Sequence, residues 1–260
     1  MKKRRKIQLF LLDLLYPNQC PCCHRKIPWN RYLCDMCQTL FQLPLDTFCP
    51  GCGKPVESCF CEKGLAYDHA IAAALYQEPA RSGILSLKRA ESKNFAYACG
   101  EVLGRMVIAD PELLAYDLIV PVPMAKRKKK KRFFNPAEEI AREMSSATGI
   151  PLRADLLEDT GTGAAQHTLS AKERAANTGH FQIPQTADLT GYRILLCDDV
   201  LTTGSTMNRC AELLKSRGAA VVTAAQHRRR RTADAGCIST ALGIFDTSCK
   251  KKKSSDFPLV

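Results

Sequence analysis

Long apolar runs and aromatic side chains are both scarce in this 260-residue chain. Aromatic residues make up 7% of it, and Trp29 is the only tryptophan. The most membrane-like stretch, residues 7–16, contains Asp13 and is half as long as a membrane-spanning helix, which needs about 20 apolar residues. Basic residues precede it as in a secretory signal, but no small-residue cleavage site follows. The sequence therefore favours a cytoplasmic protein without a transmembrane segment. We expect residues 8–15 to form an amphipathic helix that packs on the segment after it or lies on a membrane surface.

Acidic residues are also in short supply, with 26 Asp and Glu against 38 Lys and Arg and a net charge of +12. More than half of the basic residues fall in four runs, at 2–6, 126–132, 228–231 and 250–253. Clusters of like charge repel one another, so they favour a polyanionic partner such as nucleic acid, a phosphorylated ligand or an anionic membrane. The simpler interpretation of any single run is a solvated surface, and the run at 250–253 is the least informative.

Cysteine is abundant, with 14 in the chain and nine of them between Cys20 and Cys61. Without a secretory signal, reduced thiolates that hold metal fit better than disulfides. Residues 1–63 show little hydrophobic periodicity, so their fold depends on that metal. From Tyr67 onward, apolar strands alternate with helices, which predicts a layered α/β domain. We therefore expect a cysteine-rich zinc module at 1–63, an α/β domain at 64–232, and a weak edge strand with a basic tail at 233–260.

The expected elements of the α/β domain follow from periodicity and end signals. Asn135 and Pro136 mark the start of one helix as its cap and first-turn residue, and Gly149 marks its end. A polar, glycine-containing segment at 160–180, helical around 171–176, is typical of a mobile cover over a site. Strands are expected at 70–76, 117–122, near 155–158, at 193–197, 220–225 and 237–245, and further helices at 80–88, 94–108 and 205–217.

The strongest chemical motif follows the strand at 193–197. Two acids come first, then a hydroxyl-rich turn that opens a helix: Asp198, Asp199, Val200, Leu201, Thr202, Thr203, Gly204, Ser205 and Thr206. Ligands of α/β sheets bind beyond the carboxyl ends of strands, and a helix start offers amide hydrogens and a positive dipole to a phosphate. Two carboxylates can accept hydrogen bonds from a ribose diol or hold hydrated Mg²⁺. Helix capping alone would explain one acid and one hydroxyl, but not two acids and four hydroxyls.

This run resembles the phosphoribosyl-diphosphate signature of type I phosphoribosyltransferases. The resemblance implies that Asp198 and Asp199 take the ribose hydroxyls as the catalytic acids and that the Thr-Thr-Gly loop takes the 5′-phosphate. The turn around Val122 and Pro123 resembles the diphosphate loop of those enzymes, and basic residues beside it would offset the leaving-group charge. Taken alone, that turn is equally a buried strand followed by a solvated basic loop.

With cysteine pairs first and this domain second, the chain resembles the ComF family of competence-associated, phosphoribosyltransferase-like proteins. The likeness runs from about Leu11 to Gln226. It implies a role for Lys88 near the diphosphate, although a lysine at a helix end is also a plain surface cation. Family members usually have Arg-Gly-Phe-Asn-Gln where this chain has Phe133 and Pro136, so the pocket is expected to differ there. The matching pieces are 11–17, the cysteine pairs, 87–88, 120–123, 134–135, the acid-Thr-Thr-Gly run, Leu169 and Phe181, and three residues expected in the mobile segment, Gln166, Arg174 and Asn177.

The cysteines form three C-x-x-C pairs and one tighter C-x-C pair. Each such turn points two thiolates at one cation, and two turns complete a tetrahedral zinc site. Closed four-thiolate sites are structural, so we expect one or two structural zinc ions. Crossed pairing and an iron–sulfur cluster remain alternatives. Taken in sequence order, the sites are Cys20, Cys23, Cys34 and Cys37, then Cys49, Cys52, Cys59 and Cys61.

Two functions follow as hypotheses. The first is a phosphoribosyltransferase of unknown acceptor that binds phosphoribosyl diphosphate with Mg²⁺ and serves DNA uptake, with other DNA-uptake proteins as further partners. The second is a non-catalytic competence factor that binds single-stranded DNA through the zinc module and the basic runs. Aromatic residues near those runs are few, apart from Phe133, Phe134 and Trp29, so electrostatic and salt-sensitive binding is expected rather than a base-stacking groove. The nucleic-acid candidates are Lys126, Arg127, Lys128, Lys129, Lys130, Lys131 and Arg132.

Overall fold

The structure is a computed structural model that describes residues 17–39, 49, 51, 59, 61, 64–75, 78–161, 180–201 and 204–228. The described strands are β1 (His69–Leu75), β2 (Leu118–Pro121), β3 (Glu158–Asp159), β4 (Phe181–Gln182), β5 (Arg193–Leu201) and β6 (Val221–Arg228). The described helices are α2 (Asp35–Thr39), α3 (Ala80–Lys88), α4 (Asn94–Ala109), α5 (Pro111–Leu114), α6 (Lys126–Arg132), α7 (Pro136–Thr148) and α9 (Ser205–Ser216).

A parallel sheet with the strand order β1-β6-β5-β2 forms the centre of the α/β domain. Parallel neighbours cannot be joined by tight hairpins, so helices carry the chain back between strands. Leu152 extends the sheet by one further parallel bridge to Ile119 of β2. The short β3 and β4 pair antiparallel in a separate ribbon. All four central strands therefore end at the same edge, which is where a ligand site of this sheet belongs.

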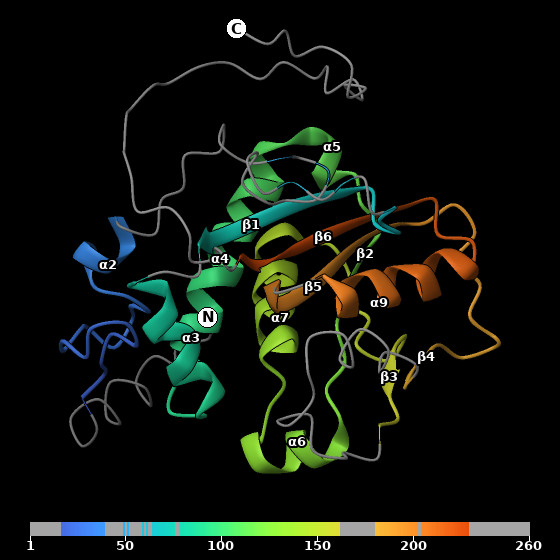
Figure 1. The fold of residues 1–260 in the computed structure, drawn as a ribbon. Helices are drawn as coiled ribbons and strands as arrows, with labels where there is room; N and C mark the ends of the chain where they lie inside the picture. The colour runs from blue at the N-terminus through green and yellow to red at the C-terminus, as the bar shows by residue number, and fades with distance from the viewer. Residues whose placement is uncertain are drawn as a thin grey trace, which may run out of the picture.

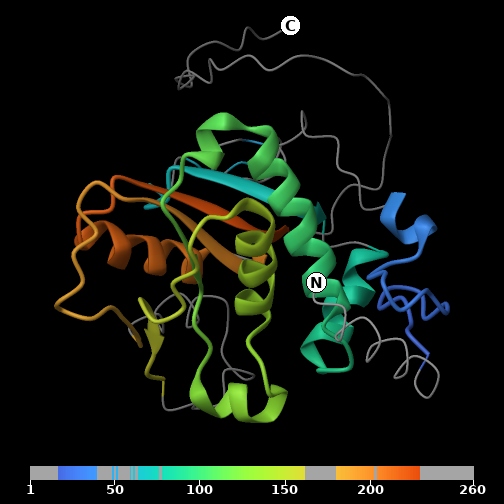
Figure 2. The same ribbon diagram turned by 180° about the vertical axis from the view of Figure 1, so that it is seen from behind.

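Alternating side chains of the strands build two cores. Along β5, Leu195 and Cys197 face the core that includes α4 and α7, whereas Ile194 and Leu196 face the core that includes α9. Successive residues of a strand point to opposite faces, and all four of these side chains are fully buried. Figures 1 and 2 show the result, with α4 and α7 over one face of the sheet and α9 over the other.

Helix α7 begins and ends as the sequence predicts. The Asn135 side chain accepts a hydrogen bond from the Ala137 amide, Pro136 occupies the first turn, and Gly149 ends the helix with a left-handed φ of 78°. A residue with a side chain would be strained at that φ, whereas glycine is not. The buried face of α7 includes Ile140 and Met144 and packs against α4.

The first cysteine segment packs directly on α3 and α4. Buried Cys20, Cys22 and Cys37 belong to the same hydrophobic core as the residues of α4. Asn94 at the start of α4 donates a hydrogen bond to the Asn18 side chain at 2.7 Å. Figure 1 shows this segment, in blue, beside α3. The cysteine segment and the α/β domain thus share part of one core.

Most of the expected elements are present with small shifts at their ends, and α3 has the expected bounds. The strand expected near 155–158 is present only as the two-residue β3 at Glu158–Asp159, because the chain turns just before it, where Arg153 pairs with Asp155 through two hydrogen bonds of 2.8 Å. The basic run at 126–132 is a helix rather than a loop. The elements expected at 8–15, 171–176 and 237–245 lie outside the described residues. No helix in the described part of the chain is both long and apolar enough to cross a membrane.

Candidate functional site

The two predicted acids lie in the last part of β5, the strand that is central to the sheet. Four buried apolar residues precede them, and the strand continues through both acids to Leu201 rather than turning at Asp198. The pairing of β5 with β6 is irregular between Cys197 and Val200. Such an irregularity re-aims side chains relative to a regular strand. The acids therefore occupy the one stretch of the β5–β6 ladder where the register shifts.

Asp198 and Asp199 are close enough to influence each other strongly. The Asp199 amide donates a hydrogen bond to the Asp198 carboxylate at 2.7 Å. Burial, together with the negative charge of Asp199, raises the pKa of Asp198 well above its usual range. Burial and the charge of Asp198 also raise the pKa of Cys210 in α9, which places Asp198 near that helix. A cation, or a ligand that donates hydrogen bonds from hydroxyl groups, would stabilise the ionised form of this carboxyl pair.

Lys88, at the end of α3, reaches the second acid from another part of the chain. Its Nζ lies 4.0 Å from Asp199 Oδ2, with side chains that are 35% and 20% exposed. The sequence places Lys88 near a diphosphate only through the family resemblance, and the structure brings it to the acid pair. Lys88 contacts only Asp199, so a metal ion such as Mg²⁺ would supply the charge that lets both carboxyls ionise.

The turn after β2 is tied to β5 just before the acids. The Val122 amide donates to the Cys197 carbonyl at 2.8 Å, and the Asn135 side chain donates to the Val122 carbonyl at 2.9 Å. Asn135 is thus more than a helix cap, and its second role was missed from the sequence because no local pattern signals a bond across 13 positions. These bonds hold the turn at Val122 and Pro123 beside the acid pair.

Helix α9 begins directly after the acid run. Gly204 is buried and has a left-handed φ of 78°, and the Asn208 amide donates to its carbonyl at 2.7 Å. Ser205 and Thr206 follow in the first turn, where backbone amides have no carbonyl partner within the helix. A helix start of this kind attracts phosphate. The remaining predicted loop residues, Thr202 and Thr203, and the segment residues Gln166, Arg174 and Asn177 lie outside the described residues.

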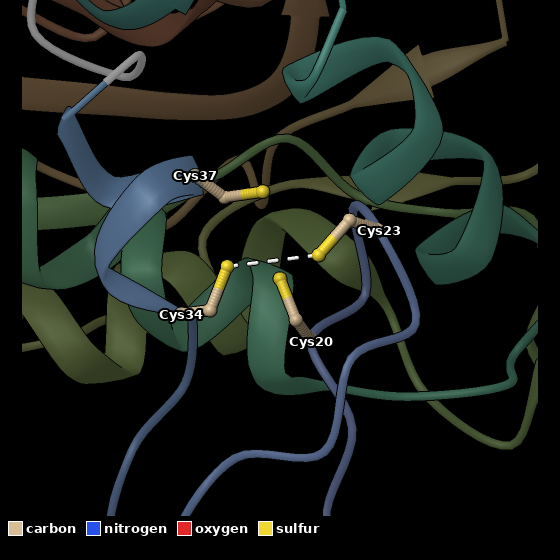
Figure 3. Close-up of side chains that lie close together, drawn as sticks. All are labelled: Cys20, Cys23, Cys34 and Cys37. Atoms are coloured by element: carbon tan, nitrogen blue, oxygen red, sulfur yellow. Dashed lines mark hydrogen bonds between the residues drawn. The ribbon is translucent and has the colours of Figure 1, made fainter.

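Four of the predicted metal ligands converge in the cysteine segment. Figure 3 shows Cys20, Cys23, Cys34 and Cys37 with their sulfur atoms directed toward one another. All four sulfurs lie within 4.8 Å of one another, and the Cys23 and Cys34 sulfurs are 3.6 Å apart. A tetrahedral zinc ion with Zn–S bonds of about 2.3 Å places its ligands about 3.8 Å apart. The donor set therefore fits zinc, and the grouping is the sequential one.

The thiols of this cluster have uneven proton affinities. Burial raises the pKa of Cys20, but hydrogen bonds from nearby backbone amides outweigh it and lower the pKa to about 7. Desolvation raises the pKa of Cys23 and of Cys37. Four close thiols cannot all ionise on their own, because each thiolate opposes the next. A bound cation would supply the missing positive charge and hold all four as thiolates.

A second group contains Cys49, Cys59 and Cys61, whose sulfurs also lie within 4.8 Å of one another. The Cys49 and Cys61 sulfurs are 3.4 Å apart. Their predicted fourth ligand, Cys52, lies outside the described residues. The three described thiols match three ligands of the second sequential site.

Comparisons with known proteins agree with this two-part organisation. A double zinc ribbon domain model matches residues 11–69, and a phosphoribosyl transferase domain model matches residues 130–249. A DNA utilization protein, YhgH, of Escherichia coli K12 is 27% identical over 222 residues, which cover 80% of this chain and 96% of that protein. Competence protein F of Haemophilus influenzae is 26% identical over 202 residues, which cover 72% of this chain and 85% of that protein.

A solved purine phosphoribosyltransferase from Pyrococcus horikoshii is 15% identical, with a TM-score of 0.33 over 54% of this chain and 93% of its own. The two domain models, the parallel sheet with helices on both faces and the cysteine quartet together define the architecture. It is a type I phosphoribosyltransferase fold with an N-terminal zinc ribbon. In this domain order, and in its likeness to relatives named for DNA utilization and competence, the chain is similar to the ComF family.

Proposed function

We propose that this chain binds phosphoribosyl diphosphate with Mg²⁺ at the carboxyl end of β5 and acts in the cytoplasm in DNA uptake. The observation that carries the proposal is the acid pair, Asp198 and Asp199, in the last part of β5, with the start of α9 at Ser205, four positions after the strand ends. The Lys88 contact to Asp199 supports it from a second element. The names of the relatives supply the biological setting.

Each group would have a distinct task in the bound complex. Asp198 and Asp199 would accept hydrogen bonds from the ribose hydroxyls, and the start of α9 with Ser205 and Thr206 would bind the 5′-phosphate. Mg²⁺ would neutralise diphosphate, and Lys88 would add charge at the same place. The reaction would be displacement at the anomeric carbon, in which a bond to the acceptor nucleophile forms as the bond to the diphosphate oxygen breaks. The chain would contribute positioning and charge stabilisation.

Calorimetric titration of phosphoribosyl diphosphate into the zinc-loaded protein with Mg²⁺ tests this proposal. The double variant Asp198→Asn/Asp199→Asn should bind at least about 10-fold more weakly, because hydrogen bonds to charged groups contribute roughly 1.5–3 kcal/mol each. Asp155→Asn is the matched control, since Asp155 is exposed and paired with Arg153 away from the acid pair. Equal affinity in the wild type and the double variant would remove the ligand from this site.

A second candidate function, single-stranded DNA binding, is favoured by α6. This helix consists only of basic residues, and no acid interrupts it. Like charges at neighbouring positions of a helix face destabilise it, so a polyanion bound along α6 would relieve that repulsion. The zinc module and the other basic runs would extend the surface. A partner of this kind also suits a protein whose relatives are named for DNA utilization and competence.

Replacing Arg127, Lys128, Lys130 and Arg132 by glutamine tests the DNA-binding function. Each lost phosphate contact should reduce the slope of log affinity against log salt by roughly 0.7 for a single strand. The expected change is therefore a weaker and less salt-dependent interaction, measured by fluorescence anisotropy at several salt concentrations. If affinity and slope stay unchanged, α6 is not part of the DNA-binding surface. Phosphoribosyl-diphosphate titration of the same variant shows whether the two proposals are independent.

A further inference from the structure

We propose that Phe133, at the end of α6, stacks on an unpaired base of a single-stranded nucleic acid whose phosphates lie along α6. This inference rests on the second of the two proposed functions and gives it a specific residue. It also gives the surface a preference for single strands, which charge alone does not provide. Phe133 is one of the few aromatic residues near the basic runs, from which the sequence predicts no stacking groove, and its exposure is known only from the structure.

Phe133 is unusually exposed for an aromatic side chain. Its exposed fraction is 88%, the highest among the large hydrophobic side chains in the described part of the chain. The next residue, Phe134, is 7% exposed and lies under Lys93, whose Nζ is 4.9 Å from the ring centroid. The two neighbouring rings thus point to different surroundings, one into the core and one into solvent. Packing accounts for an aromatic residue at position 134 but not at position 133.

The backbone at Phe133 makes its exposure more informative. Phe133 ends α6 in the left-handed region with a φ of 62°, and its amide donates to the Lys129 carbonyl at 2.7 Å. Glycine adopts this conformation without penalty, whereas a bulky residue is strained in it. The left-handed φ and the exposed apolar ring are both unfavourable, and no packing of Phe133 in the folded chain offsets them. Strain of this kind is typical of binding sites.

The charges around Phe133 supply the second part of a strand-binding surface. Two lysines of α6 pair with acids, Lys126 with Glu158 at 2.9 Å and Lys129 with Glu138 at 3.3 Å. Glu158 and Glu138 offset part of the charge of the seven basic residues of α6, and the helix remains strongly basic. Basic grooves that follow a backbone, combined with aromatic rings that stack on bases, are the common solution for single strands.

The position of α6 links this surface to the sugar-phosphate site. The chain reaches α6 from the carboxyl end of β2, through Val122, which is hydrogen-bonded to Cys197 next to the acid pair. Figure 1 shows α6 beyond that end of the sheet. A strand along α6 would therefore lie on the same side of the sheet as Asp198 and Asp199. Stacking requires an exposed base face, and paired bases inside a duplex do not offer one.

Fluorescence anisotropy with a labelled oligothymidine single strand and a duplex of the same length tests the inference. Phe133→Ala should weaken single-strand binding by about 5- to 100-fold, the range for loss of one base-stacking ring, and should leave duplex binding nearly unchanged. Phe133→Trp should retain the affinity, because the ring remains. Phe133→Leu keeps apolar volume without an aromatic face and should behave like Phe133→Ala.

Tyr192→Ala is the matched control, because Tyr192 is also an exposed aromatic, at 41%, but precedes β5 at the opposite end of the strands. It should bind the single strand as the wild type does. Wild-type affinity in Phe133→Ala, or equal losses in Phe133→Ala and Tyr192→Ala, would overturn the inference while leaving charge-driven DNA binding intact. Absence of single-strand binding by the wild-type protein would overturn both. Phosphoribosyl-diphosphate affinity, measured in parallel, reports separately on the first proposed function.

Discussion

Asp198 combines a role in the proposed site with a cost to the folded protein. Its carboxyl is partly buried beside Asp199, and burial with that neighbouring charge raises its pKa. An unfolded aspartate has a pKa of about 3.9. As pH rises from that value toward the raised pKa of the folded state, the unfolded chain releases its proton first, so the free energy of unfolding decreases. Above the folded-state pKa the decrease is complete.

Asp198→Asn should therefore raise the thermal midpoint of the ligand-free protein at neutral pH. The gain should disappear below about pH 4, where both the folded and the unfolded wild type are protonated at this position. Thermal unfolding at a series of pH values without Mg²⁺ measures it. Asp155→Asn is the control, and its effect on the thermal midpoint should have the opposite sign. The hydrogen bonds from Arg153 lower the pKa of Asp155, so this variant should lower the midpoint at neutral pH. A lower midpoint for Asp198→Asn at neutral pH would contradict the prediction.

At the scale of elements, α4 and α7 approach closely because α4 carries glycines on its contact face. A Cβ built on Gly100 would lie 2.6 Å from the Ile140 carbonyl oxygen and 2.5 Å from Glu143 Cβ. A Cβ on Gly104 would lie 3.0 Å from Ala147 Cβ. The first contact includes backbone and cannot yield easily. These two glycines set how near α7, and with it the cap at Asn135, lies to the rest of the core.

Gly100→Ala should destabilise the protein by about 1–3 kcal/mol, the usual cost of forcing extra volume into a packed interface. Gly104→Ala should cost less, since its nearest contact is a single methyl and alanine is the better helix former. Chemical denaturation of both variants measures the difference. An equal or larger loss for Gly104→Ala would show that the helices do not meet as described.

Local signals in the sequence predicted much of the fold. The bounds of α3 and the cap, proline and glycine of α7 follow from residues close together in the chain. The basic run was not recognised as the helix α6, because seven like charges disfavour a helix and only tertiary context decides it. The strand expected near 155–158 is shorter and begins later, as β3 at Glu158–Asp159, because the ion pair and turn before it are not visible in apolar periodicity.

The candidate site shows the same division. The acid pair and the first cysteine quartet were found from motif spacing, and the structure gathers the quartet as expected. The contact of Lys88 with Asp199 and the bonds at Val122 join positions far apart in the chain, so spacing alone cannot supply them. The sequence marks Phe133 as a departure from the family pattern and as one of the few aromatic residues near the basic runs, but its exposure and left-handed φ are properties of the folded chain.

At the scale of the whole molecule, the cysteine segment braces the side of the core that carries Lys88. Cys20 and Cys37 are buried in the core that contains α3 and α4, and the Tyr32 and Tyr97 rings pack with centroids 5.3 Å apart. Helix α9 belongs to the other core. A metal in the quartet should thus stabilise one half of the α/β domain more than the other.

Removal of zinc, or the variant Cys34→Ser/Cys37→Ser, should lower the thermal midpoint by about 10 °C, a loss of a few kcal/mol for a chain of this size. Hydrogen exchange should speed up in α3 and α4, while α9 serves as the internal reference. Affinity for phosphoribosyl diphosphate should fall as well, because Lys88 ends α3. Uniform loss of protection, or none in α3 and α4, would mean that the cysteine segment does not brace this half. Metal content by mass spectrometry provides the control for loading.

Asn135 closes the loop that connects β2 to α7 and contains α6. The Asn135 side chain donates a hydrogen bond to the Val122 carbonyl before α6 and accepts one from the Ala137 amide at the start of α7. These two hydrogen bonds close the segment that contains α6 and Phe133. Chain length and composition inside a closed surface loop are tolerated at small cost. The length of this loop, its charge and the residue at position 133 can therefore change during evolution while the sheet and the acid pair stay unaltered.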